Sequence, residues 1–160
     1  MSDIVHFIGI DPGVGGGIAW TSPVGDQSAS MPATLHDTLA LINKILDEQS
    51  DGKTLAYVEE LPKHGGLMSS SSIFVLARNY GQCEGILAAL SVTIHHVKPQ
   101  AWQKALGLGS REKTGSPHRD RTKWKNKLKA KAQHLYPEEN VTLDTADALL
   151  ILHAATSGLI

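Results

Sequence analysis

Two short apolar segments, each ending in an acidic residue, constrain the fold of this chain most strongly. Residues 5–11 are largely apolar up to Asp11, and residues 54–59 are largely apolar up to Glu59. Runs of this length that are rich in β-branched and aromatic residues are typical of strands, and near-continuous apolarity is typical of strands inside a parallel sheet. We therefore expect the ends of the two strands to bring Asp11 and Glu59 side by side.

The remaining periodicities predict an α/β fold. Apolar residues spaced three and four apart predict amphipathic helices, and clusters of Gly, Ser and Pro predict turns and loops. The expected strands are a hairpin of residues 5–11 and 17–21, followed by strands over 54–59 and 92–97. The expected helices cover 34–48, 73–90, a short stretch around 101–104 within residues 99–109, 122–135, and a last helix that starts near 144–146 and ends at 158. Loops are expected over 62–72 and 110–121.

Two further carboxylates, Asp144 and Asp147, open the apolar segment of residues 148–152. Residues three apart on a helix share a face, and the helix dipole favours acidic side chains at an N-terminus. Clustered carboxylates repel one another, and hard divalent cations such as Mg²⁺ relieve that repulsion through carboxylate oxygens. The sequence therefore predicts a metal site built from Asp11, Glu59, Asp144 and Asp147.

For three of these four carboxylates, the sequence also allows an explanation other than metal binding. Asp11 begins an Asp-Pro-Gly sequence, which also suits a simple turn. Glu59 is followed by Glu60, and consecutive strand side chains point to opposite faces, so only one of the two meets Asp11. Asp144 is also a suitable cap for the last helix. We favour Glu59 over Glu60 and regard Asp144 as the weakest member.

Composition narrows the class of protein further. With 160 residues, 41% of them hydrophobic, the chain is expected to fold as one domain with a real core. Its single cysteine, Cys83, forms no internal disulfide and falls in an apolar helical pattern. No segment resembles a secretion signal or a membrane span. We expect a soluble, unsecreted protein of the cytoplasm or another reducing compartment.

Charge is distributed unevenly although the formal net charge is only −1. Residues 98–131 hold eleven Lys and Arg against two acidic residues, a local charge of +9, and the rest of the chain carries −10. Such a surface attracts a polyanion, as phosphodiester chemistry requires. The alternative for residues 123–131 is an ordinary solvated Lys-rich helix.

Four segments carry a resemblance to a known family: Ile8-Gly9-Ile10-Asp11-Pro12-Gly13, Val58-Glu59, Tyr80-Gly81-Gln82-Cys83-Glu84-Gly85-Ile86-Leu87, and Asp144-Thr145-Ala146-Asp147-Ala148-Leu149. Together they resemble the RuvC-like Holliday junction resolvases of the RNase H-like superfamily. The resemblance implies a mixed five-stranded sheet flanked by helices, and Asp11, Glu59, Asp144 and Asp147 as ligands of two Mg²⁺ or Mn²⁺ ions per active site. It also implies a homodimer that resolves four-way DNA junctions by paired symmetric nicks, in DNA recombination and repair.

The same resemblance suggests where DNA is contacted. The loop after Glu59 matches the family's junction-entering region, which makes Leu67 and Met68 candidates for an apolar wedge, and residues 107–113 match a stretch that places a basic contact at Lys113. Trp102 is a candidate for stacking on a base. The expected phosphate contacts come from Lys63, His64, Arg78, Lys98, Lys104, Arg111, Lys113, Arg119, Arg121 and Lys123.

Two departures separate the chain from typical bacterial members. Its basic region over residues 110–131 is longer and richer in charge than theirs, and Trp102 stands at a position where they often have a different residue. These departures favour the viral, phage or organellar branch.

Competing functions are another RNase H-like nuclease that acts on flaps or RNA–DNA hybrids, and a non-catalytic protein that binds branched DNA. The glycine-rich turn after Asp11 also resembles the phosphate loop of actin-like ATPases, but 160 residues leave no room for their second domain.

Overall fold

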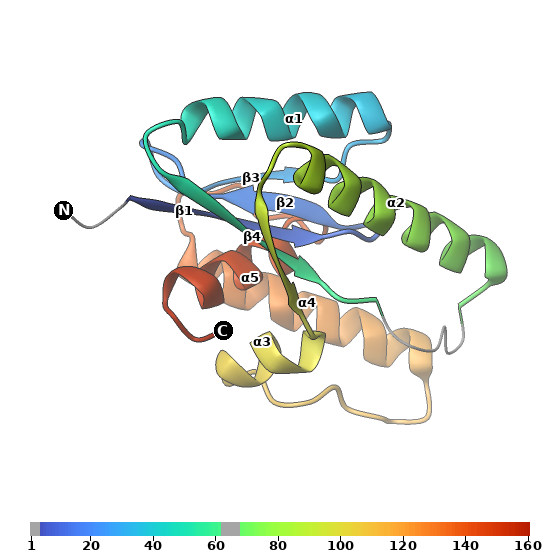
Figure 1. Ribbon diagram of the computed structural model, residues 1–160. Coiled ribbons are helices and arrows are strands. Elements are labelled where there is room, and N and C mark those ends of the chain that lie inside the picture. The colour runs from blue at the N-terminus through green and yellow to red at the C-terminus, as the bar shows by residue number, and fades with distance from the viewer. Residues whose placement is uncertain (1–3, 62–67) are drawn as a thin grey trace.

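A mixed five-stranded sheet forms the centre of the computed structural model, which describes residues 4–61 and 68–160 (Figure 1). The strands lie in the order β3-β2-β1-β4-β5. Their bounds are Val5–Asp11 for β1, Gly17–Trp20 for β2, Gln27–Ser30 for β3, Lys53–Glu59 for β4 and Thr93–Val97 for β5. Strand β1 is antiparallel to β2 and parallel to β4, and β4 is also parallel to β5. The predicted mixed sheet and the central, parallel position of β4 are confirmed.

Helices cover both faces of the sheet, which makes three layers (Figure 1). Their bounds are Leu35–Glu48 for α1, Ser70–Ala89 for α2, Pro99–Ala105 for α3, Pro117–Leu135 for α4 and Ala146–Thr156 for α5. Helices α1 and α2 share one apolar core with the sheet, and α3, α4 and α5 share a second core on the opposite face. No helix of the described residues is long and apolar enough to cross a membrane.

Helix α5 lies directly on the backbone of β1. A Cβ atom at Gly9 would lie 2.5 Å from the carbonyl oxygen of Ala148 and 2.8 Å from the backbone nitrogen of Leu152, so only glycine permits this approach. Nine of the eleven α5 residues are buried. This contact sets the N-terminal turn of α5, which carries Asp147, beside the end of β1, which carries Asp11.

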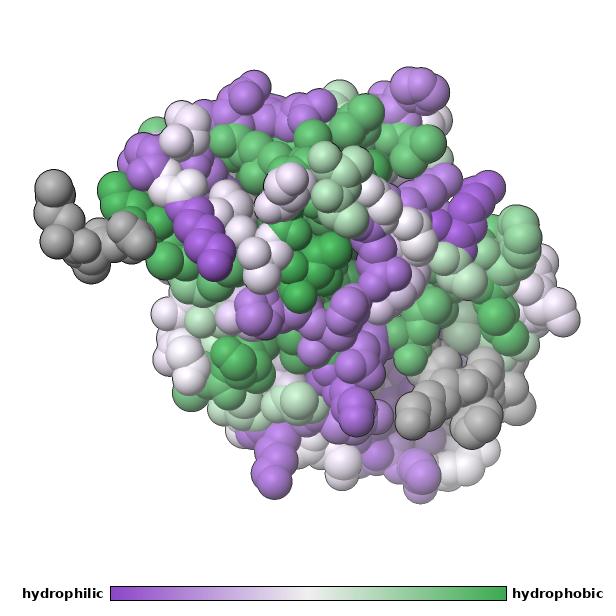
Figure 2. Space-filling view, in the orientation of Figure 1, coloured by the Kyte–Doolittle hydropathy of each residue, from purple (hydrophilic) through white to green (hydrophobic). Residues whose placement is uncertain are grey.

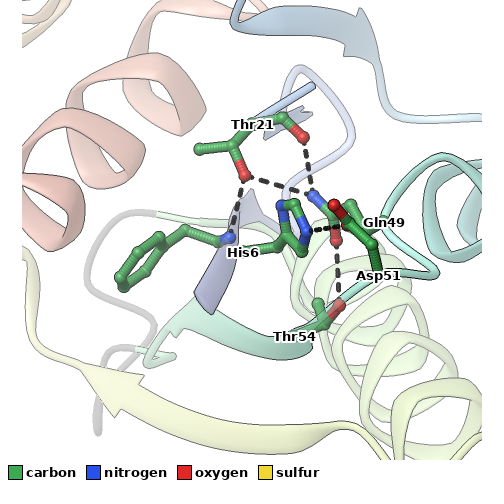
Figure 3. Close-up of polar contacts among 6 residues, drawn as sticks. His6, Thr21, Gln49, Asp51 and Thr54 are labelled. Carbon is green, nitrogen blue, oxygen red and sulfur yellow. Dashed lines mark hydrogen bonds and ion pairs between the residues drawn. The ribbon is translucent and has the colours of Figure 1, made fainter. Parts of the chain in front are cut away.

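A buried polar cluster anchors the other end of the sheet (Figure 3). The side-chain amide nitrogen of Gln49 donates to the Thr21 carbonyl oxygen at 2.7 Å, and its amide oxygen accepts from the Thr54 hydroxyl at 3.0 Å. The Thr21 hydroxyl in turn accepts from the backbone N–H of Phe7 at 3.0 Å. Since a buried amide without partners destabilises a fold, these bonds hold the end of α1 to β1, β2 and β4.

Several predicted boundaries are wrong, each for a local reason. Helix α2 starts at Ser70, earlier than predicted, because the Ser69 hydroxyl accepts from the Ser72 N–H as an N-cap. Helix α4 starts at Pro117, inside the segment predicted as a loop, because proline suits the first turn of a helix. Helix α5 starts at Ala146, which is within the range predicted for its start, and Asp144 therefore precedes it. The predicted loop over residues 62–72 lies mostly outside the described residues.

Candidate metal centre

Asp11 ends β1 and leads into a turn that holds its carboxylate in place. The Gly13 N–H donates to Asp11 Oδ1 at 3.0 Å, and the Gly16 N–H donates to the Gly13 carbonyl oxygen at 3.0 Å. A Cβ atom at Gly16 would lie only 2.1 Å from the Asp11 carbonyl oxygen, so the turn requires glycine there. The result is a buried carboxylate with one oxygen bound to its own turn.

Glu59 ends β4, the strand parallel to β1, and its carboxylate faces Asp11 and Asp147. The indole Nε1–H of Trp102 donates to Glu59 Oε2 at 2.8 Å. The next residue, Glu60, donates its backbone N–H to the Val97 carbonyl oxygen at 2.9 Å, and its side chain lines a separate surface hollow with His95. Of the two glutamates, Glu59 is therefore the one beside Asp11.

Asp147 lies in the first turn of α5 with its side chain almost fully buried. Its Oδ2 accepts a hydrogen bond from the ammonium group of Lys125, which comes from the middle of α4. Its Oδ1 is buried and has no hydrogen-bond partner within the described part of the chain. A buried oxygen without a donor is costly, which makes it suited to an additional cation.

Asp144 lies in the turn before α5 and is only half-buried. The expectation that Asp144 and Asp147 share a helix face is wrong, because the helix begins after Asp144. The capping alternative is also wrong, because Thr145 holds the N-cap position. The Asp144 side chain nevertheless borders the turn after Asp11, since its Oδ1 lies 3.4 Å from where a Cβ on Gly15 would be.

Electrostatic strain marks the cluster of Asp11, Glu59 and Asp147. Burial first, and then the neighbouring charges of Asp11 and Asp147, raise the pKa of Glu59 to about 8 against the opposing effects of Trp102 and Lys125. Burial and the charge of Asp147 likewise raise the pKa of Asp11 to about 6. The carboxylates thus resist being ionised together, and a bound cation would relieve their repulsion.

Lys125 supplies one positive charge to this cluster, and the sequence did not single it out. Burial alone would lower the pKa of its ammonium group, but the charges of Asp147, Asp11 and Glu59 outweigh burial and raise it. Lysine occupies every second position from Lys123 to Lys131, so no periodicity distinguishes the one that points inward. Only the packing of α4 against α5 identifies it.

The donor set fits a hard divalent cation. In this arrangement no three Asp, Glu, His or Cys side chains of the described residues stand close enough to hold one ion. Even so, the acidic side chains offer oxygen atoms alone, the buried Asp147 Oδ1 lacks a donor, and one lysine faces three carboxylates. Oxygen-rich, anionic sites of this kind suit Mg²⁺ and Mn²⁺.

The proposed DNA contacts lie mainly on the surface. Met68 is exposed, whereas Lys63, His64 and Leu67 lie outside the described residues. Exposed side chains in the described part are Arg78, Lys98, Lys104, Arg111, Lys113, Arg119, Arg121 and Lys123. Lys123 pairs with Glu112 at 2.6 Å, and both partners face solvent. Exposure leaves these groups accessible to phosphate, and their role stays a prediction.

The prediction that Trp102 stacks on a base is wrong, because its side chain is fully buried. Its ring belongs to the core beneath α3, and its N–H is bonded to Glu59. An exposed aromatic that the sequence analysis missed is Phe74, whose exposed fraction is 67%. It lies near the start of α2, where Figure 2 shows apolar surface. Nothing in the sequence indicated that Phe74 is exposed, because it lies among the apolar residues of a predicted helix.

The strand order, the antiparallel hairpin of β1 and β2, and the helix laid on β1 define an RNase H-like α/β fold. Within this class the fold is RuvC-like. The structure of Thermus thermophilus RuvC in complex with a Holliday junction substrate superimposes with a TM-score of 0.60 at 14% identity, covering 96% of this chain and 97% of that chain. A second Thermus thermophilus RuvC structure gives a TM-score of 0.56 at 15% identity, with the same coverage. No protein-family model matches the sequence, and no curated protein matches it.

Proposed function

We propose that this chain is a metal-dependent, structure-selective endodeoxyribonuclease that resolves four-way DNA junctions. The observation that supports this most strongly is the cluster of Asp11, Glu59 and Asp147, which come from distant segments of a RuvC-like fold. Asp11 and Asp147 are buried and Glu59 is partly buried. The Thermus protein of that fold has been solved with a Holliday junction. Carboxylate clusters that hold paired metal ions are the common means of phosphodiester hydrolysis.

Asp11, Glu59, Asp144 and Asp147 would hold two Mg²⁺ or Mn²⁺ ions. Such ions, when bound, lower the pKa of an attacking water and stabilise the leaving oxygen of a phosphodiester. Asp11 would hold both ions, because the charges of Asp147 and Asp144 act on its carboxylate and its own charge acts on Glu59. Glu59 and Asp147 flank it as ligands of one ion or the other. Asp144, which lies in the turn before α5, would be a further ligand that helps to orient water.

The DNA contacts in this proposal come from two surfaces. The basic segment of residues 98–131 supplies phosphate contacts, as its local charge of +9 suggests. Phe74 and Met68, exposed at the start of α2, supply apolar side chains that can stack on unpaired bases at a branch point. Two symmetric nicks require two active sites related by a two-fold axis, so we propose a homodimer.

The test is cleavage of a labelled four-way junction by wild-type protein and by Asp11→Asn, in Mg²⁺ and in EDTA. The wild type should cut only with Mg²⁺, giving symmetric nicks that a ligase seals, and Asp11→Asn should bind the junction without cutting it. Retained Mg²⁺-dependent cutting by Asp11→Asn would refute the assignment.

The same assay with a flap, an RNA–DNA hybrid and a linear duplex separates the alternatives. Preference for the flap or the hybrid would indicate a different RNase H-like nuclease. Junction binding without any cutting by the wild type would indicate a protein that only binds branched DNA.

A further inference from the structure

Trp102 is the only buried residue of the short helix α3, and it connects that helix to the metal centre. Its indole ring is fully buried in the core shared by α3, α4 and α5. Its Nε1–H points out of that core and donates to Glu59 Oε2 at 2.8 Å. The ring cannot move without disturbing close-packed neighbours, so the donor is fixed in space.

Because the indole N–H binds only Oε2, the two carboxylate oxygens of Glu59 are not equivalent. An indole has a single N–H and no acceptor, so it occupies Oε2 and leaves Oε1 unbonded by the ring. It is also uncharged, and so it does not compete with a cation for the carboxylate. Lys125 does compete with a cation, because its charged ammonium group neutralises the Asp147 carboxylate and occupies one of the carboxylate oxygens.

Glu59 needs such a restraint because of its surroundings. The carboxylates of Asp11 and Asp147 repel it, and a glutamate side chain has enough rotatable bonds to turn away from them. A hydrogen bond from a rigid donor opposes that rotation. Mutation of a group that holds a metal ligand in this way typically lowers metal affinity or activity about 10- to 100-fold.

We propose that Trp102 is a positioning residue that fixes the Glu59 carboxylate through Oε2 and presents Oε1 to a divalent cation. This inference rests on the proposed metal-dependent function and adds a residue that acts through Glu59. It assigns Trp102 a role other than DNA stacking and gives α3 a function in the fold.

The chain offers a closely matched control in Trp20. This residue is also buried, and its Nε1–H also donates to a glutamate, Glu48 Oε2, at 3.0 Å. It lies at the end of β2 remote from Gly17, the residue paired with Asp11. Trp20→Phe therefore removes the same kind of bond from a similar environment, away from the metal centre.

The experiment compares Mn²⁺ affinity by calorimetry for the wild type, Trp102→Phe and Trp20→Phe, together with the melting temperature of each in EDTA. Trp102→Phe should weaken Mn²⁺ binding about 10- to 100-fold, and Trp20→Phe should leave it within about twofold of the wild type. Both variants should lose some thermal stability, so stability alone does not produce the expected difference in affinity.

Wild-type affinity in Trp102→Phe would overturn the inference and leave the proposed function intact. An equal loss of affinity in Trp20→Phe would also overturn it, since general loosening would then be the cause. A wild type that binds no Mn²⁺ would refute the proposed function and this inference together. If Trp102→Phe does not fold, benzothienylalanine at position 102 keeps the ring shape without the N–H and should give the same loss.

Discussion

Replacing Lys125 with methionine removes the positive charge that pairs with Asp147 in the acidic cluster and keeps most of the aliphatic side chain. The Lys125 side chain is 29% exposed and that of Asp147 is 7% exposed, so their ion pair lies between the surface and buried extremes. Exposed pairs contribute about 0.2–1 kcal/mol, and breaking a buried pair costs about 3–5 kcal/mol. We expect Lys125→Met to lower the metal-free free energy of unfolding by about 2 kcal/mol, or about 4–8 °C in melting temperature for a chain of this size.

Thermal unfolding at pH 8, in EDTA and in excess Mg²⁺, tests this expectation. Mg²⁺ at about one hundred times its dissociation constant stabilises a folded protein by about 2.7 kcal/mol. Lys125→Met should gain more than the wild type does, because no ammonium group competes with the metal for Asp147. The deficit seen in EDTA should therefore shrink.

Lys123→Met is the control, because Lys123 lies on the same helix in an ion pair whose partners are 68% and 62% exposed. It should change stability by less than about 1 kcal/mol in either buffer. The reasoning is wrong if Lys125→Met melts with the wild type in EDTA, or if Mg²⁺ leaves its deficit unchanged.

Three further outcomes are expected. The pKa values of Glu59 and Asp11 are raised to about 8 and about 6, so the folded protein retains protons that the unfolded chain has lost. The metal-free free energy of unfolding should therefore fall as pH rises from about 4 to 8. The fall should be up to about 1.4 kcal/mol per pH unit for each retained proton. Denaturant titrations should show this slope in EDTA and a flatter one in Mg²⁺, and a rise with pH would contradict it. Gly9→Ala should lose about 1–3 kcal/mol or fail to fold, because its Cβ would meet the α5 backbone; unchanged chemical denaturation would contradict that packing. Phe74→Ala should melt within about 0.5 kcal/mol of the wild type yet bind junction DNA more weakly in a gel-shift titration, and wild-type binding would exclude a DNA contact.

Much of the fold could be predicted because strand ends and helical periodicity are local signals. Asp11 and Glu59 fall at the ends of apolar runs, and two parallel strands bring such ends together without further information. Strand β3 gave no such signal, because Gln27–Ser30 contains only small or polar residues at the edge of the sheet. Its place depends on pairing with β2, which no property of its own sequence indicates.

The surroundings of the carboxylates could not be predicted, because they depend on which side chains the tertiary packing turns inward. Trp102 looked like a candidate for DNA stacking until the packing of α3 showed its ring buried and its N–H on Glu59. Lys125 is one of five alternating lysines, and only the position of α4 beside α5 selects it. Asp144 does not share a helix face with Asp147, because Thr142 and Thr145 exchange hydrogen bonds in a turn that ends only where α5 begins.

The central claim is that Asp11, Glu59 and Asp147 form one centre for divalent cations. Its most direct test is a crystal structure of the protein soaked in Mn²⁺, with data collected at a wavelength where manganese scatters anomalously. We expect anomalous peaks bounded by these three carboxylates, with the Lys125 ammonium displaced from Asp147. Manganese bound only elsewhere, with Lys125 still on Asp147 at saturating metal, would contradict the claim.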